Sequence, residues 1–422
     1  MDKLGRIVLI IMGMALLDSL METKLVQTSV GIGSLDTSMV AIAQAADAWS
    51  PPIQITKGGT YTGRWRSLSP DIPAVKVLTN EPVIIENCQI QSAGDGIWSI
   101  DQKAQLTVRN CLGRGLNPNI ANRQKGYFIN IGNFSEAIVK NNTVISFGHG
   151  IRALNYGPAI EWSGQTVLIR YNRFQNVDGR LSDGKDGYLF DLEGSGANAI
   201  GLNTLRRAKV KIAWNQVINQ PFYSSVEDLI STYKSSGTSA DPIAIHDNYL
   251  QGGYAPDPGA YVDRSGAMIN VGDDPDKGDV GHVDVYNNQV VSFENSGILI
   301  SAGHDNRVYR NRVVSAQRTS DGLILGGTWR SGLVLWDYYN GGANGHWYNN
   351  SMYANKVNVV GKDGKAALNH LPSVGGTNEV TETRNPSKHL ATQADERAEY
   401  RYWRQKLVKA GVRIGCWSWK RC

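Results

Sequence analysis

The sequence lacks a hydrophobic run long enough to cross a bilayer comfortably, because its N-terminal apolar stretch, Ile7 to Leu17, has only eleven residues. It also has no Cys/His spacing of a zinc site, no phosphate-binding loop and no nucleophile elbow. An excess of charge of one sign is missing too, since 43 basic and 38 acidic residues leave a formal net charge of +5. We therefore expect no stable membrane span and no nucleic-acid partner.

The first residues have the features of an export signal. Lys3 and Arg6 precede the apolar stretch, and the small residues of AQAADA, Ala43 to Ala48, suit cleavage by a signal peptidase. We expect residues 1–45 to be an export segment. The sequence thus predicts a secreted or periplasmic protein.

One six-residue pattern, aliphatic-x-x-Asn-x-aliphatic, recurs along the chain, as in VYNNQV at Val285 to Val290. Nine copies place these residues at the fourth position: Cys88, Cys111, Asn142, Asn172, Asn215, Asn248, Asn288, Asn311 and Asn350. Successive fourth positions lie 23 to 43 residues apart, which is a spacing typical of solenoids. The copies are rich in Val, Ile, Tyr and Trp and alternate with period two, so they indicate β-strands.

A second short strand follows most copies and usually opens with glycine, as in GYFINI at Gly126, GYLFDL at Gly187 and GILISA at Gly297. Two or three short strands in each coil, stacked in parallel, predict an all-β right-handed parallel β-helix. Stacking places equivalent residues of neighbouring coils about 4.8 Å apart. We interpret the repeated Asn residues as an inward-facing structural ladder.

With this ladder and these strands, Ile53 to Asn358 resembles the pectate-lyase-like superfamily of secreted bacterial parallel β-helix proteins. The resemblance implies a fold rather than an activity, because the superfamily includes lyases, hydrolases, epimerases and non-catalytic adhesins. The Asp-Pro-His-Asp run of the β-helix mannuronan epimerases is missing from this sequence. None of the superfamily's catalytic signatures can be placed residue by residue, so the candidate residues below depend on position alone.

The solenoid is expected to span residues 49–360 and to be followed by a C-terminal region, residues 361–422, that packs on it or caps it. That region begins as a polar segment and continues into a predicted helix, Thr392 to Ala410. Thr392 and Asp395 are placed for an N-terminal cap, and Gly411 for the stop. We expect the whole protein to be a monomer.

The four cysteines suit an oxidising compartment. Cys88 and Cys111 occupy equivalent ladder positions one coil apart, so they can face each other and form a disulfide. Cys416 and Cys422 can close a small loop. The alternative for the first pair is that they are simply two small buried side chains of the ladder.

Polar residues gather at the ends of the second strands of the middle coils, beside the two longest insertions. Asp191 and Glu193 are two apart on a predicted strand, so their side chains point the same way with Cα atoms about 6.6 Å apart. Glycoside hydrolysis uses two carboxyl groups at comparable separation. Asp273 is expected about 10 Å away by coil stacking. These three residues are the candidate hydrolytic site.

A polysaccharide lyase needs a base for the proton at C5 of a uronate and a cation that neutralises the adjacent carboxylate. His304, in SAGHDNR, is the best candidate base because Asp305 can orient it. Lys234 and His246 are further candidate bases, and Arg180 and Arg307 are candidate neutralising cations. The alternative is that His304 has a structural role in a turn.

Outward residues two positions before the ladder form a basic stripe on the early coils, including Arg170, and a tyrosine stripe on the late coils, including Tyr286, Tyr309 and Tyr348. Such stripes suit sugar carboxylates and sugar rings, although stacking of like side chains is an equal explanation. The run GDDPDKGD suggests Ca²⁺ bound by Asp273, Asp274 and Asp276, with a metal-free acidic turn as the alternative. No other cofactor is indicated.

These observations lead to two hypotheses. The first is a secreted enzyme that cleaves a polysaccharide, as a lyase or a glycoside hydrolase, in a groove lined by Asp191, Glu193, Asp273 and His304. The second is a non-catalytic polysaccharide-binding or cell-surface protein that uses the two stripes. Convergence of the four residues in one cleft would favour the enzyme, and a flat stripe without a cleft would favour the binding protein.

Overall fold

A computed structural model describes residues 48–157, 159, 162–190, 196–260, 267–272 and 280–416. The chain divides into two units at Ala48, and all helices and strands of the described residues belong to the second, Trp49–Cys422. The predicted export segment, residues 1–45, lies outside the described part of the chain.

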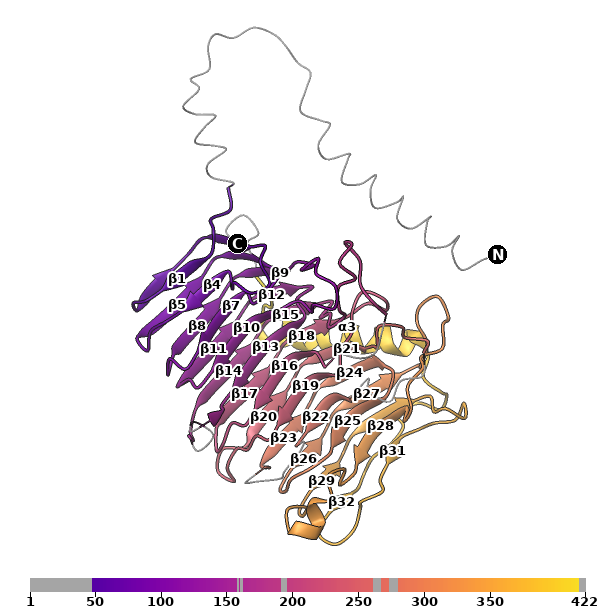
Figure 1. The fold of residues 1–422 in the computed structure, drawn as a ribbon. Coiled ribbons are helices and arrows are strands. Elements are labelled where there is room, and N and C mark those ends of the chain that lie inside the picture. Colours follow the sequence, from indigo (N-terminus) through magenta and orange to yellow (C-terminus); the bar gives the residue numbers. More distant parts are fainter. Residues whose placement is uncertain are drawn as a thin grey trace, which may run out of the picture. The chain divides into compact units, whose positions relative to one another are not determined.

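The second unit is a right-handed parallel β-helix, which confirms the predicted fold (Figure 1). Three parallel sheets take their strands in strict rotation, so every third strand in the sequence belongs to the same sheet. Among the described residues, the first sheet consists of β1 (Ile53–Ile55), β4 (Val75–Val77), β7 (Ile97–Ile100), β10 (Tyr127–Gly132), β13 (His149–Leu154), β16 (Asn198–Asn203), β19 (Asp228–Tyr233), β22 (Ala267–Val271), β25 (Ser296–Ile300), β28 (Ser331–Leu335) and β31 (Asn369–His370).

The other two sheets complete each coil. The second sheet consists of β2 (Gly59–Tyr61), β5 (Pro82–Glu86), β8 (Gln105–Arg109), β11 (Glu136–Lys140), β14 (Thr166–Arg170), β17 (Lys209–Ala213), β20 (Ile243–His246), β23 (Val283–Tyr286), β26 (Arg307–Tyr309), β29 (Ser351–Tyr353) and β32 (Glu379–Val380). The third sheet consists of β3 (Arg64–Ser67), β6 (Gln89–Ser92), β9 (Leu112–Gly115), β12 (Thr143–Ile145), β15 (Arg173–Gln175), β18 (Gln216–Ile218), β21 (Tyr249–Gly253), β24 (Gln289–Phe293), β27 (Arg312–Ser315) and β30 (Lys356–Val359). A 3₁₀ helix, η2 (Gly341–Asn344), lies between β28 and β29. The last two strands, β31 and β32, follow residue 360 and pair with β28 and β29.

Alternation along each strand builds the core. In β8, for example, Leu106 and Val108 point inward and are buried, while Gln105, Thr107 and Arg109 face outward. The same pattern recurs in β11 and β14, whose residues pair one to one with their neighbours. Each coil therefore buries its apolar side chains against the coils before and after it, as in other solenoids.

The asparagine ladder is confirmed and lies inside the stack at the turn between the second and third sheets. From Asn142 to Asn311, each ladder Asn donates its side-chain N–H groups to the Oδ1 atom of the next one and to a backbone carbonyl, at 2.9–3.1 Å. The chain of bonds runs through Asn142, Asn172, Asn215, Asn248, Asn288, Asn311 and Asn355. These amides are fully buried, so the ladder satisfies polar groups that water cannot reach.

The ninth predicted ladder position was wrong. Asn355, not Asn350, accepts the hydrogen bonds of Asn311. Asn350 belongs to a second, shorter ladder at the turn between the first and second sheets, where it accepts from Asn306 (2.9 Å) and its own backbone N–H donates to Asn378. Each coil has more than one inward corner, and an inward Asn is useful at either.

Cys88 and Cys111 are joined by a disulfide, with Cα atoms 4.6 Å apart. Both are fully buried, and the backbone N–H of Cys111 donates to Asn142 Oδ1 at 3.0 Å. The disulfide thus continues the ladder toward the N-terminal coils. Cys416 is also disulfide-bonded. Cys422, its predicted partner, lies outside the described residues.

The predicted C-terminal helix is α3 (Gln393–Ala410), with a capping box between Thr392 and Asp395 and a left-handed Gly411 at its end. The helix lies along the outer face of the third sheet rather than over an end of the stack (Figure 1). Trp403 is completely buried there, and its indole N–H donates to the carbonyl of Asp247 at 2.8 Å. Within the described residues, no helix has the length and apolar composition needed to cross a membrane.

One carboxyl of this helix makes its packing sensitive to pH. Burial raises the pKa of Glu396 to about 7, although a hydrogen bond from the backbone N–H of Ala316 (2.7 Å) opposes the shift. Because the folded-state pKa lies above the unfolded value, the stabilising contribution is complete at low pH and is lost as the pH rises through about 7. We expect Glu396→Gln to exceed the wild type in free energy of unfolding by on the order of 2 kcal/mol at about pH 8, and to equal it at about pH 4. Urea unfolding at the two pH values checks this, and a pH-independent difference would contradict it.

Candidate functional site

The outward face of the first sheet presents polar side chains in register across many coils. Strand pairing places Asn130, Arg152, Gly201, Ser231 and Asn270 side by side on β10, β13, β16, β19 and β22. Side chains two residues away on a strand point to the same face. The sheet therefore displays parallel rows of outward groups, and these rows form the floor of a groove.

Two clefts of about 380 Å³ and 300 Å³ lie along this face and share Glu227, Asp228 and Tyr339 as lining residues. We call them together the groove. Its first half is lined mainly by Tyr127, His149, Arg152, Asn198, Ser231 and Tyr233. Its second half is lined mainly by Asn270, Ser301, Trp329, Trp336 and Tyr338. The groove thus runs across the strands from β10 to β28.

Two carboxylates lie where the halves meet. Asp228 is buried, and its carboxylate accepts hydrogen bonds from the backbone N–H of Ala267 (2.8 Å) and the side chain of Asn270 (3.2 Å). Glu227, immediately before β19, is exposed. One carboxylate is therefore buried and held in a fixed orientation, and the other belongs to an exposed residue.

The same arrangement occurs four coils earlier. Asp95 accepts from the backbone N–H of Tyr127 and from the side chain of Asn130, both at 2.8 Å. Burial raises the pKa of Asp95, and the two hydrogen bonds oppose this shift. Asp95 itself does not line the two clefts, although its donors Tyr127 and Asn130 belong to the groove, so it is a structural counterpart of Asp228.

The first half of the groove contains a neutral histidine beside a cation. His149 stacks on Tyr127 with ring centroids 4.1 Å apart, and the guanidinium of Arg152 lies 4.3 Å from the Tyr127 ring centroid. Burial and the nearby charge of Arg152 lower the pKa of His149 to about 3. The backbone N–H of Asn198 donates to His149 Nδ1 at 3.2 Å, so the ring proton is on Nε2. Arg152 is consequently the charged group that an anionic sugar would meet here.

The second half of the groove is aromatic. Trp329 and Trp336 meet edge to face at 4.9 Å, Trp336 meets Tyr338 at 4.8 Å, and Tyr338 meets Tyr339 at 5.0 Å. Trp329, Tyr338 and Tyr339 are exposed. Exposed amphipathic rings of this kind suit ligands that combine apolar faces with hydroxyl groups, as sugars do.

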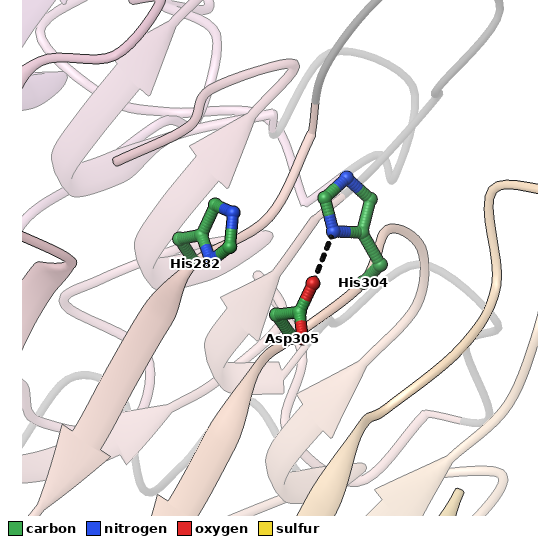
Figure 2. A group of neighbouring side chains, drawn as sticks. All are labelled: His282, His304 and Asp305. Carbon is green, nitrogen blue, oxygen red and sulfur yellow. Dashed lines mark hydrogen bonds and ion pairs between the residues drawn. The ribbon is translucent and has the colours of Figure 1, made fainter. Parts of the chain in front are cut away.

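The described residues do not test whether the four predicted catalytic residues lie together. Asp191, Glu193 and Asp273 lie outside the described residues, as do the predicted calcium ligands, Asp273, Asp274 and Asp276. His304 does not line the groove and lies instead beside His282 and Asp305 (Figure 2). The predicted strand at Gly187 was wrong, because β16 (Asn198–Asn203) occupies that place in the first sheet.

The predicted stripes lie on a different face, the outside of the second sheet. His246, Tyr286, Tyr309 and Tyr353 form one stacked column with ring centroids 4.7–5.1 Å apart. Tyr353 takes the place predicted for Tyr348, since the ladder continues through Asn355. Two of the predicted arginines are on the same sheet. Arg170 lies opposite Lys140 and Ala213 of the neighbouring strands, and the guanidinium of Arg307 forms an ion pair with Asp284.

Two further predicted substrate-binding residues, Arg180 and Lys234, differ in their distance from the surface and in their contacts. The guanidinium of Arg180 is buried, pairs with Asp178 and donates to the carbonyl of Phe222. Lys234 follows β19, and its ammonium lies 5.2 Å from the ring centroid of Tyr233, which lines the groove. Lys234 therefore adjoins a residue that lines the groove.

The central groove carboxylates, Glu227 and Asp228, were missed because the second strands were recognised by an opening glycine. β16, β19 and β22 begin with Asn, Asp and Ala. A signal was nevertheless present, since VEDLIS at Val226 to Ser231 and GAMINV at Gly266 to Val271 each contain a short apolar run, which is consistent with a buried strand.

Comparisons with known proteins add no functional assignment. A scan against protein-family models, a search of the curated proteins and a search of the solved structures give no match.

Proposed function

We propose that the protein is a secreted enzyme that binds an extended polysaccharide along the groove and cleaves it there. The observation that carries this proposal is the order of groups along the groove: a cationic end at Arg152, carboxylates at Glu227 and Asp228, and an aromatic end at Trp329 and Trp336. The apolar leader and the Cys88–Cys111 disulfide support secretion. The resemblance to the pectate-lyase-like superfamily supports a carbohydrate ligand.

Hydrolysis fits the described groove better than β-elimination does. Both nitrogens of His149 are close to partners, Nδ1 to the N–H of Asn198 and Nε2 to Gln124 Oε1 at 3.4 Å, so this ring is poorly placed as a base. Burial also raises the pKa of Tyr127, which keeps its hydroxyl protonated near neutral pH. Glu227 and Asp228 both line the groove, and glycoside hydrolysis uses two carboxyl groups.

The test is an activity screen of the purified full-length protein on anionic and neutral polysaccharides, with and without EDTA. New reducing ends and unsaturated ends are measured together. We expect reducing ends without the ultraviolet absorbance of unsaturated sugars, and about a 100-fold loss of activity in Glu227→Gln and in Asp228→Asn. Asp95→Asn, which removes the matching hydrogen bonds around a carboxylate that does not itself line the groove, is the control and is expected to retain more activity than Asp228→Asn.

Other outcomes are equally informative. Unsaturated ends would show that the enzyme cleaves by elimination rather than by hydrolysis. Equal losses in Asp95→Asn and Asp228→Asn would assign Asp228 a structural role.

A second candidate function is polysaccharide binding without cleavage. The observation that favours it is the column of His246, Tyr286, Tyr309 and Tyr353, whose parallel rings form a flat surface on the second sheet. Retention on a polysaccharide column, with no cleavage product and loss of retention in Tyr309→Ala, would favour this function.

A further inference from the structure

Two histidines and an aspartate converge at the turn between the first and second sheets. The backbone N–H of His282 donates to the carbonyl of His304 at 3.1 Å, which stacks the two turns directly on each other. His282, Asp305 and Asn349 hold equivalent places in successive coils, and all three have left-handed backbones with φ of 53°, 53° and 52°. His, Asp and Asn are the non-glycine residues that tolerate this conformation best. The backbone of the turn therefore positions the side chains.

Three potential ligand atoms face one another in this cluster. One donor atom from each of His282, His304 and Asp305 lies within 4.8 Å of the other two (Figure 2). His304 Nδ1 and Asp305 Oδ2 are 2.8 Å apart. In a tetrahedral Zn²⁺ site the donor atoms are about 2.0–2.2 Å from the metal and roughly 3.4 Å from each other. Side-chain rotations that move the ligand atoms by about 1 Å would therefore bring these three atoms to the distances of a zinc site. We propose that these three residues bind a divalent transition-metal ion such as Zn²⁺.

The surroundings leave room for further ligands. His282 and Asp305 line a hollow of about 220 Å³ whose other lining residues include Thr238, Ser239 and Asn349. Three protein ligands and an adjoining polar hollow are the features of a metal site that keeps a position for water or another small ligand. The side chain of Asn349 donates to Asp305 Oδ1 at 3.1 Å, which fixes the orientation of the carboxylate.

The charge and the donor type select the class of ion. Arg307, a cation that lines the same hollow, is paired with Asp284 (2.7 Å), so its charge is compensated locally. Two imidazole nitrogens and one carboxylate oxygen suit Zn²⁺, Co²⁺, Ni²⁺ or Cu²⁺ rather than Ca²⁺, which prefers oxygen ligands. The site uses other residues than the predicted calcium ligands, and none of its three residues lines the groove.

Metal titration of the full-length protein without a polyhistidine tag tests the proposal. Zn²⁺ binding is measured by calorimetry, and Co²⁺ binding by its visible absorption. We expect one ion per chain and a loss of affinity of about 100-fold or more in His282→Asn. Asparagine preserves the left-handed backbone, as Asn349 shows one coil away from Asp305, so this variant is expected to fold.

A matched control is available within the chain. His246 and Asp247 repeat the adjacent His–Asp pair, with Nδ1 and Oδ2 at 2.8 Å, but His246 stacks on Tyr286 rather than facing a second histidine. His246→Gln is therefore expected to bind metal like the wild type. Binding other than one ion per chain, or unchanged affinity in His282→Asn, would overturn the proposal. Loss of metal binding in His304→Gln but not in His282→Asn would also overturn the proposal, because the site would then not need His282.

Discussion

Replacing Asp178 by asparagine is expected to lower the free energy of unfolding by about 4 kcal/mol. The Asp178 carboxylate lies between Lys125 Nζ (2.7 Å) and Arg180 Nε (2.7 Å), and all three side chains are at most 7% exposed. Burial lowers the pKa of Lys125, and the charge of Asp178 opposes that shift. Removing the only negative charge of this trio would leave two cations buried in a medium that solvates them poorly.

Urea unfolding measures the effect, and an exposed ion pair provides the control. Arg123 and Asp71 also form a pair, but the Asp71 side chain is 73% exposed, so Asp71→Asn is expected to cost less than about 0.5 kcal/mol. A cost below about 1 kcal/mol in Asp178→Asn would contradict the expectation, since burial would then carry no penalty.

The pH dependence of this variant has a definite sign. Burial alone raises the pKa of Asp178, but Lys125 and Arg180 outweigh burial and leave it below the ordinary value of 3.8. The contribution of Asp178 is therefore present above that value and is lost as the pH falls through the lower folded-state pKa. The difference in stability between wild type and Asp178→Asn should shrink on acidification.

The second large effect is expected from the middle of the asparagine ladder. The Oδ1 atom of Asn215 accepts two hydrogen bonds, from the backbone N–H and the side-chain N–H of Asn172. The side-chain nitrogen of Asn215 donates to Ile169 O and Asn248 Oδ1. Asn215→Ala would leave several of these groups without partners in a site closed to water. Unsatisfied buried groups cost about 1–3 kcal/mol each, so we expect a total loss of about 4 kcal/mol.

A graded comparison separates the ladder from side-chain size. Asn355 lies at the end of the ladder, where its side chain makes three hydrogen bonds, to the backbone and side-chain nitrogens of Asn311 and to Val308 O. Asn355→Ala is expected to cost roughly 1 kcal/mol less than Asn215→Ala in urea unfolding. Equal costs at the two positions would indicate lost packing rather than lost hydrogen bonds.

The ladder was predictable because the same Asn position of the six-residue pattern recurs in successive coils. The sequence pattern failed only where two inward corners of one coil both contain Asn. WYNNSM and MYANKV both fit the six-residue pattern, and Asn350 and Asn355 belong to different ladders. Strand pairing decides between them, since Val308 pairs with Met352 and Tyr309 with Tyr353. Period-two alternation within a strand contains no information about which sheet the strand joins.

The groove was less predictable than the fold, for a geometric reason. Its floor comes from strands of successive coils, but insertions of variable length separate those coils and hide their register. Its aromatic end comes from Trp329, Tyr338 and Tyr339, which lie outside the strands. The convergence of His282 with His304 was hidden too, because it depends on the stacking of two left-handed turns rather than on any local motif.

The C-terminal helix changes how a solenoid of this kind loses its structure. In a simple stack, each coil contacts only its neighbours, so an end can fray while the remainder persists. Here Glu399 of α3 pairs with Arg312 on β27, whereas the backbone N–H groups of Gly415 and Cys416 donate to Tyr171 O and Thr143 Oγ1. The segment from α3 to residue 416 therefore bridges the coils from β12 to β27. These six coils are expected to melt as one cooperative block, leaving only the coils beyond them to fray.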